Sequence, residues 1–324
     1  MTRLRCLSVL ACTLLATSPL LAQQDRQRTS SDARDIVVTG ELPPQREVTR
    51  QARAITATSN IRHYPLPLFG DRLCPGVFGM KGDYAALIID RIRANAERFD
   101  LWMSEDDGSC TPNLIVAFVD DGQAVLQQVS ERRHWLFQGM PRHERLELLA
   151  EGGPVRVWAA TGMRTRDGMS PVSSQTLGDG ALAVGNPATG PQTVQLWSAS
   201  SRLFLPVRED ITWVLVLFDR DDVRDKTLLQ LADYATMRGL ARTRPVEADG
   251  ATLDTILALF DPSAEPPAEL TQFDRAYLGA IYRGLPNLVG ITKVHGVNRE
   301  MRRQAEQAAA VEARAVDGEA RSPE

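Results

Sequence analysis

The chain of 324 residues is poor in the side chains that most often carry chemistry. It contains only four histidines and four cysteines, and the histidines are scattered. No G-x-S-x-G sequence is present, and Gly178-Asp179-Gly180 does not continue to the third glycine of a dinucleotide-binding loop. These absences argue against a serine hydrolase of that type and against an enzyme that uses a dinucleotide, so no cofactor is expected.

Runs of one charge and long apolar runs are also missing. The 37 Lys and Arg residues are interleaved with the 41 Asp and Glu residues along most of the chain. Basic patches that would neutralise phosphates are therefore not apparent, and no nucleic-acid partner is expected. The apolar run at 7–16 is about ten residues long, whereas a helix that spans a membrane needs roughly 20. The run is too short for a permanent membrane span.

Residues 1–22 do have the three-part pattern of a secretory signal peptide. Arg3 and Arg5 precede the apolar run, and the small residue Ala22 stands before a polar stretch. The pattern predicts cleavage after Ala22 and a periplasmic or secreted protein. Lipidation at Cys12 is the alternative, although it leaves an apolar core of only about six residues, shorter than usual for a signal.

Removal of this segment would leave Cys74 and Cys110 as the only cysteines. Two cysteines in an oxidising compartment suggest one disulfide. The bond would close a loop of about 35 residues and stabilise the fold by about 3 to 4 kcal/mol. Two buried free thiols or a metal pair are the alternatives, although a structural zinc site needs four ligands.

Residues 23–60 contain few large apolar side chains and are predicted to form a flexible arm. Within the arm, Asp35-Ile36-Val37-Val38-Thr39-Gly40 has strong strand propensity. This segment resembles the Ile-Val-Val-Thr-Gly stretch near the mature N-terminus of TonB-dependent outer-membrane receptors and of many secreted proteins from sphingomonad-type bacteria. Through Ile36, Val37 and Val38, it could add a strand to the sheet edge of an envelope protein. The barrel of such receptors is absent.

A single globular α+β domain is predicted over residues 61–290, with one mixed sheet flanked by helices. Thr271 and Asp274 give the last helix of the domain a start similar to a capping box. Residues 291–324 are rich in Ala, Glu and Arg and are expected to form a frayed tail. Apolar periodicity predicts helices at 83–99, 122–133, 224–240, 252–260 and 271–283, a short helix after Pro141, and strands at 113–119, 155–161, 193–198 and 211–218.

The C-terminal part of this domain contains an apolar strand at 213–218, followed by the helical sequence Ala232-Asp233-Tyr234-Ala235-Thr236-Met237-Arg238-Gly239. A closing helix begins at Leu270-Thr271-Gln272-Phe273-Asp274. Over residues 205–287, this order resembles the metzincin type of metalloprotease, and the closing helix is similar to the end of matrixin catalytic domains. More closely, the chain looks like an uncharacterised family of secreted alphaproteobacterial proteins.

In metzincins the active-site helix reads H-E-x-x-H-x-x-G-x-x-H and binds zinc. With Gly239 aligned, the ligand positions fall on Ala232, Thr236 and Arg242, and the general base falls on Asp233. An alanine has no lone pair, a threonine hydroxyl is a weak ligand, and an arginine is a cation that repels the metal. The resemblance therefore implies a degenerate domain without zinc ligands. An ordinary amphipathic helix is the alternative interpretation.

The sequence His143-Glu144-Arg145-Leu146-Glu147 is a second candidate for metal binding. His143 and Glu147 are four residues apart on one helical face, and Glu144 is adjacent. A solvated face whose charges pair along the helix is the alternative. The remaining histidines, at 63, 134 and 295, are expected to be surface or structural residues.

The leading hypothesis is an exported, non-catalytic protein that acts by binding or in association with the cell envelope. The alternative is a secreted hydrolase similar to a metallopeptidase. Its atypical site would use Asp233 and Tyr234 together with His143 or His295.

Overall fold

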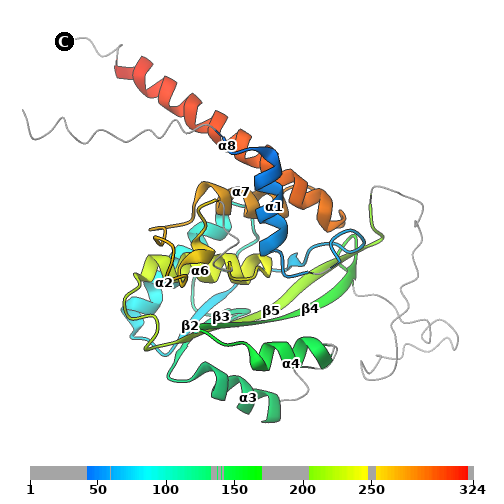
Figure 1. The fold of residues 1–324 in the computed structure, drawn as a ribbon, viewed down its shortest axis with the longest axis vertical. Helices are drawn as coiled ribbons and strands as arrows, with labels where there is room; N and C mark the ends of the chain where they lie inside the picture. Colours follow the sequence, from blue (N-terminus) through cyan, green and yellow to red (C-terminus); the bar gives the residue numbers. More distant parts are fainter. Residues whose placement is uncertain are drawn as a thin grey trace, which may run out of the picture. The chain divides into compact units, whose positions relative to one another are not determined.

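The computed structural model describes residues 42–58, 60–132, 137, 140, 142–169, 204–246 and 253–319. These residues form a single α+β domain, in which helices cover both faces of a five-stranded mixed sheet (Figure 1). The predicted fold class is confirmed. The predicted signal peptide, the segment at 36–38, His134 and the strand at 193–198 lie outside the described residues.

The sheet is built around its longest strand, β5 (Val207–Asp219). Along one edge of β5, β1 (Leu68–Phe69) is parallel to its first half and β3 (Leu114–Val119) is parallel to its second half. β2 (Pro75–Phe78) continues the parallel order beyond β3. β4 (Val155–Thr165) pairs with the other edge of β5 and is antiparallel. The sheet is therefore mixed.

Side chains of β3 alternate between the two faces of the sheet, as the period of two requires. Leu114, Val116 and Phe118 join the large core, whereas Ile115 and Ala117 pack with a smaller one. α3 (Gly122–Arg132) and α4 (Arg142–Ala150) cover the small core. Figure 1 shows these two helices below the sheet and the other helices above it.

The large core lies beneath α2 (Gly82–Glu97), α6 (Leu228–Ala241) and α7 (Gln272–Tyr282). α7 begins with the predicted capping box, because the Thr271 side chain accepts from the Asp274 backbone and the Asp274 side chain accepts from the Thr271 backbone. α6 begins with a second capping box. These caps fix where both helices start and therefore which residues face the sheet.

A helix was expected at 252–260, but the described part of that range contains only a helical turn, η2 (Ile256–Ala258). The Asp274 carboxylate explains the difference. It accepts hydrogen bonds from the Thr255 hydroxyl at 2.5 Å and from the Ile256 backbone at 2.8 Å. These bonds hold the turn against the start of α7, so tertiary contacts override the local helical pattern.

A first unexpected helix, α1 (Gln45–Ile55), lies within the range predicted to be a flexible arm. Its side chains Val48, Ala52 and Ile55 are buried in the large core. Three apolar residues at helical spacing suffice for a buried stripe, even though the segment is polar overall. The compact unit therefore begins at Leu42, and the predicted boundary at residue 60 is too late.

A second unexpected helix, α8 (Gly290–Glu319), occupies the predicted frayed tail. Val294, Val297 and Met301 are buried, and α8 packs against α1 and α7. The first three turns of α8 therefore belong to the core, so the predicted domain end at 290 is too early. Within the described residues, no helix combines the length and the hydropathy that a membrane crossing requires.

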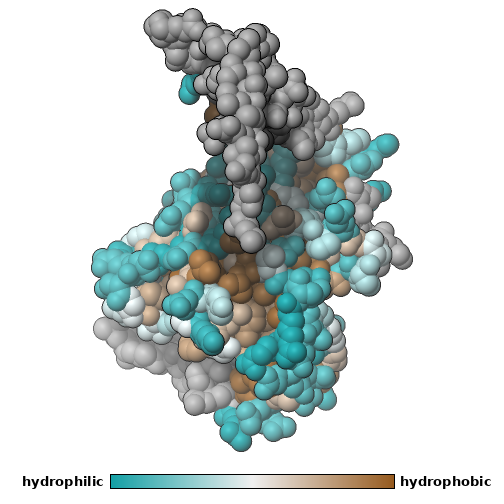
Figure 2. All heavy atoms as spheres, turned by 90° about the vertical axis from the view of Figure 1, so that its left-hand side faces the viewer, coloured by the Kyte–Doolittle hydropathy of each residue, from teal (hydrophilic) through white to brown (hydrophobic). Residues whose placement is uncertain are grey.

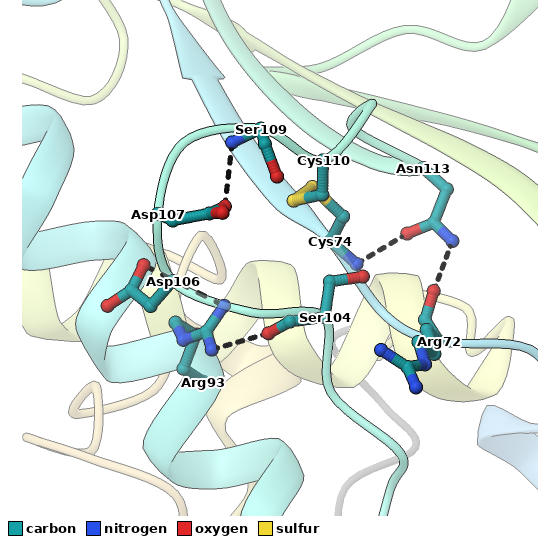
Figure 3. Close-up of a disulfide and its surroundings, with 9 residues drawn as sticks. All are labelled: Arg72, Cys74, Arg93, Ser104, Asp106, Asp107, Ser109, Cys110 and Asn113. Carbon is teal, nitrogen blue, oxygen red and sulfur yellow. Dashed lines mark hydrogen bonds and ion pairs between the residues drawn. A yellow bond between two sulfur atoms is a disulfide. The ribbon is translucent and has the colours of Figure 1, made fainter.

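The predicted disulfide between Cys74 and Cys110 is present, with Cα atoms 6.2 Å apart. Asn113 supports it from the same loop (Figure 3). The Asn113 side-chain oxygen accepts from the Cys74 backbone at 2.8 Å, and its amide nitrogen donates to the Arg72 carbonyl at 2.8 Å. The disulfide thus ties the loop that precedes β3 to the start of β2.

Candidate functional site

Two of the three positions aligned with zinc ligands lie inside the interface between α2 and α6. Ala232 and Thr236 are completely buried. The Thr236 hydroxyl donates to the Ala232 carbonyl at 2.8 Å and accepts from the Asn95 side chain at 3.2 Å. Both positions are therefore filled by packing and hydrogen bonding, and neither faces solvent.

The third aligned position, Arg242, ends α6. Its backbone is left-handed, with φ of 44°, and its guanidinium lies 3.9 Å from the Glu209 carboxylate of β5. This contact directs the side chain toward the sheet. Within the described ranges, no group of three or more His, Cys, Asp or Glu side chains is arranged to hold a metal ion.

Asp233, the aligned general base, is a buried structural clamp. Its carboxylate accepts from Arg91 Nε and Nη2, both at 2.7 Å, from Asn95 Nδ2 at 2.6 Å and from the Leu270 backbone at 2.8 Å. Hydrogen bonding to Asp233 raises the pKa of Arg91, and the exposed Glu269 adds to this effect. Four donors join α2, α6 and the segment before α7 at this carboxylate, which leaves it poorly placed to accept a substrate proton.

Tyr234 is also committed to the interior. Its hydroxyl accepts from Arg238 Nη1 at 3.0 Å, and its ring packs edge-on against Phe260 at 5.0 Å between centroids. Burial raises the pKa of Tyr234 above its ordinary value. The side chain stabilises the core beneath α6 and has no route to a surface substrate.

The histidines of the alternative hydrolase site lie on different elements from α6. His143 and Glu144 are exposed on α4, on the opposite side of the sheet (Figure 1). His295 is exposed on α8 and contacts Arg53 of α1. The sheet separates α4 from α6, so the structure does not bring His143 and Asp233 together. His63 is exposed.

An open cleft of about 1010 Å³ lies beside α1 and α8. It was not predicted, because its residues fall in the supposed arm and tail. Its basic side chains come from one exposed face of α1, opposite the buried stripe of that helix. The lining residues are Pro44, Gln45, Arg46, Thr49, Arg50, Arg53, Ala54 and His295.

The three arginines of α1 recur at positions i, i+4 and i+7 and therefore lie on one helical face. No carboxylate of the described residues forms an ion pair with Arg46, Arg50 or Arg53. Arg53 Nη2 lies 2.8 Å from His295 Nε2. Because a guanidinium only donates, His295 Nε2 is the acceptor of this bond. Within the described residues, the guanidinium groups of this cleft therefore have no neutralising carboxylate partner.

Apolar surface is found elsewhere on the domain. α2 lies on the left-hand side of Figure 1, and the view from that side shows apolar side chains gathered near the centre with hydrophilic ones around them (Figure 2). Tyr84 and Leu87 of α2 and Leu229 of α6 are each about half exposed. Nothing in the described residues indicates what would cover these side chains.

A second cavity, of about 590 Å³, lies between the chain before α1 and the loop before α7. Pro43, Pro266, Pro267 and Phe273 contribute to its lining together with the acidic residues Asp254 and Glu265. In contrast to the α1–α8 cleft, none of its described lining residues is basic.

Comparison of the chain with models of protein families, with curated proteins and with solved structures gives no match.

Proposed function

We propose that the protein is exported and acts as a non-catalytic binding or envelope-associated protein. The main support is that α6 lacks side chains that could bind a catalytic zinc. Its aligned ligand positions are an alanine, a hydrogen-bonded threonine and an arginine, and the first two are completely buried. A catalytic zinc needs three protein ligands and an open coordination position, and these side chains offer neither.

The resemblance to a degenerate metzincin remains part of this proposal. The order of the apolar strand, the long helix and the closing helix, on which the resemblance rests, recurs as β5, α6 and α7. Export is supported by the signal-like pattern at 1–22 and by the disulfide, since disulfides persist in oxidising compartments. A periplasmic or secreted location follows from the proposal.

Metal analysis of the purified protein tests the absence of zinc catalysis. We expect far less than one zinc per chain and no peptide hydrolysis above that of the Asp233→Asn variant. A known zinc peptidase purified in the same buffers controls for metal loss. One zinc per chain, together with peptide hydrolysis that the variant lacks while circular dichroism shows it to be folded, would instead establish the alternative, a secreted hydrolase with an atypical site.

Cell fractionation tests export. We expect the complete chain outside the cytoplasm with Cys74 and Cys110 oxidised, and a variant without residues 2–22 in the cytoplasm with free thiols. Alkylation followed by mass spectrometry measures the thiols. Equal distribution of both forms would contradict a signal at this position.

The segment at 36–38 gives the proposed envelope contact a separate test. If Ile36, Val37 and Val38 add a strand to a partner, deletion of residues 35–40 should abolish capture of that partner from envelope extracts. A variant that carries the same residues in scrambled order serves as the matched control. Unchanged capture after the deletion would end this idea.

A further inference from the structure

The cationic face of α1 is held in place by contacts on its other side. Val48, Ala52 and Ile55 are buried, and Gln51 exchanges two hydrogen bonds with the Leu253 backbone, at 2.8 and 2.7 Å. At the end of the helix, the Thr56 side chain bonds the Ala52 carbonyl at 2.6 Å. A charged surface on a fixed helix needs little further ordering when it binds a ligand.

The positive charge of the cleft continues along α8. Arg299 and Arg302 are exposed, and they lie four and seven residues after His295 on the same side of α8. Arg53 lies beside His295, whereas Pro43 and Met301 line one common cavity. α1 and α8 are therefore antiparallel, and Arg299 and Arg302 extend toward the N-terminal end of α1.

Among the described residues, two nearby carboxylates are withdrawn from solvent, whereas Glu306 is exposed one turn after Arg302. Glu300, which lies between Arg299 and Met301, is buried and is engaged by Arg283 and Arg303. Glu47 is the only acidic residue of α1, and it is partly buried. The whole chain carries a formal net charge of −4, so this cluster of cations departs from the overall balance.

We infer that the cleft between α1 and α8 binds the phosphate group of an anionic ligand. This inference rests on the proposed binding function and gives it a ligand class. The planar guanidinium groups of Arg46, Arg50 and Arg53 suit phosphate because each can donate two parallel hydrogen bonds to its oxygens. A soluble phosphorylated molecule and the headgroup of an anionic lipid share this chemistry.

The test removes the three charges from α1 with the variant Arg46→Gln, Arg50→Gln and Arg53→Gln. Binding of pyrophosphate is measured by calorimetry, and binding to vesicles by co-sedimentation. The vesicles contain phosphatidylglycerol and phosphatidylcholine in equal parts, or phosphatidylcholine alone. We expect the wild-type protein to bind pyrophosphate or the anionic vesicles and the variant to bind at least about tenfold more weakly.

A matched control carries Arg98→Gln, Arg132→Gln and Arg142→Gln, which remove three exposed arginines in or directly after other helices. Its affinity should remain within about twofold of the wild-type value, because these arginines do not line the cleft and salt screens the effect of the overall charge on binding. Thermal melting of both variants checks that the fold is intact. Equal loss of binding in the two variants would overturn the inference.

The two probes also separate the sources of the phosphate. Binding to pyrophosphate identifies a soluble ligand, and binding to the anionic vesicles alone identifies a lipid headgroup; either supports the inference. Binding to neither probe overturns it. Zinc is measured on the same sample. A protein free of zinc that binds no phosphate contradicts this inference alone, whereas stoichiometric zinc with peptide hydrolysis contradicts the proposed function.

Discussion

Replacement of Asp233 by Asn tests whether this residue is a clamp or a base. The carboxylate is completely buried, and it accepts four hydrogen bonds from Arg91, Asn95 and Leu270 at 2.6 to 2.8 Å. Asparagine preserves the shape of the side chain but removes the charge and one acceptor oxygen. The amide N–H groups of the asparagine would face the N–H groups of Arg91, Asn95 or Leu270, which are donors as well, so those hydrogen bonds would be lost.

The cost follows from the burial of both partners. The Arg91 side chain is only 16% exposed, so its charge would lose its main partner in a place that water reaches poorly. Breaking a buried ion pair from one side costs about 3 to 5 kcal/mol. The bonds to Asn95 and Leu270 belong to the same network and are not added separately. We expect the free energy of unfolding to fall by about 3 to 5 kcal/mol.

Urea denaturation at neutral pH, followed by circular dichroism, measures the loss. Glu269→Gln is the matched control, because it removes the other carboxylate that bonds Arg91, at 2.9 Å. Glu269 is 57% exposed, so this change should cost no more than about 1 kcal/mol. If both variants cost the same, or if Asp233→Asn costs less than about 1 kcal/mol, the clamp assignment is refuted.

Three further predictions concern stability. Replacing Cys74 and Cys110 with Ser should lower the free energy of unfolding by about 3 to 4 kcal/mol, measured in urea against the oxidised protein. Burial raises the pKa of Asp274 to about 6 from 3.8, so the folded protein binds this proton more tightly than the unfolded chain. Stability should therefore fall by about 2 to 3 kcal/mol as pH rises from about 4 to 6, and Asp274→Asn should remove this component of urea curves recorded across that range. Ala52→Glu places a charge in the core and should lower the melting temperature by at least about 5 °C, whereas exposed Ala54→Glu should not.

The elements that sequence patterns predict well are those whose signal is local. β3 and α2 were recognisable because apolar residues recur along them at the periods of a strand and a helix. The Thr271 capping box needs only four residues. The disulfide followed from the cysteine count and the compartment. In each case the relevant residues are adjacent or very few.

The features that were missed depend on distant residues. α1 appeared disordered because average composition hides a stripe of Val48, Ala52 and Ile55, although their spacing would have revealed it. The arginine spacing on its opposite face was a second available signal. The role of Asp233 could not be predicted, because its main partner, Arg91, is 142 residues away in sequence. The alignment of Asp233 with the general base of metzincins drew attention to this residue, but it could not show that the carboxylate is buried.

The packing of α1 against α8 and α7 also bears on the order in which the protein folds. The buried face of α1 is completed by α8, from the far end of the chain, and the Thr56 hydroxyl directly after α1 bonds the Tyr277 hydroxyl of α7 at 2.8 Å. During synthesis from the N-terminus, α1 therefore has no binding surface until the last helices have been made. α1 therefore joins the core only once nearly the whole chain is present, long after the strands of the sheet, which end at Asp219, have been synthesised.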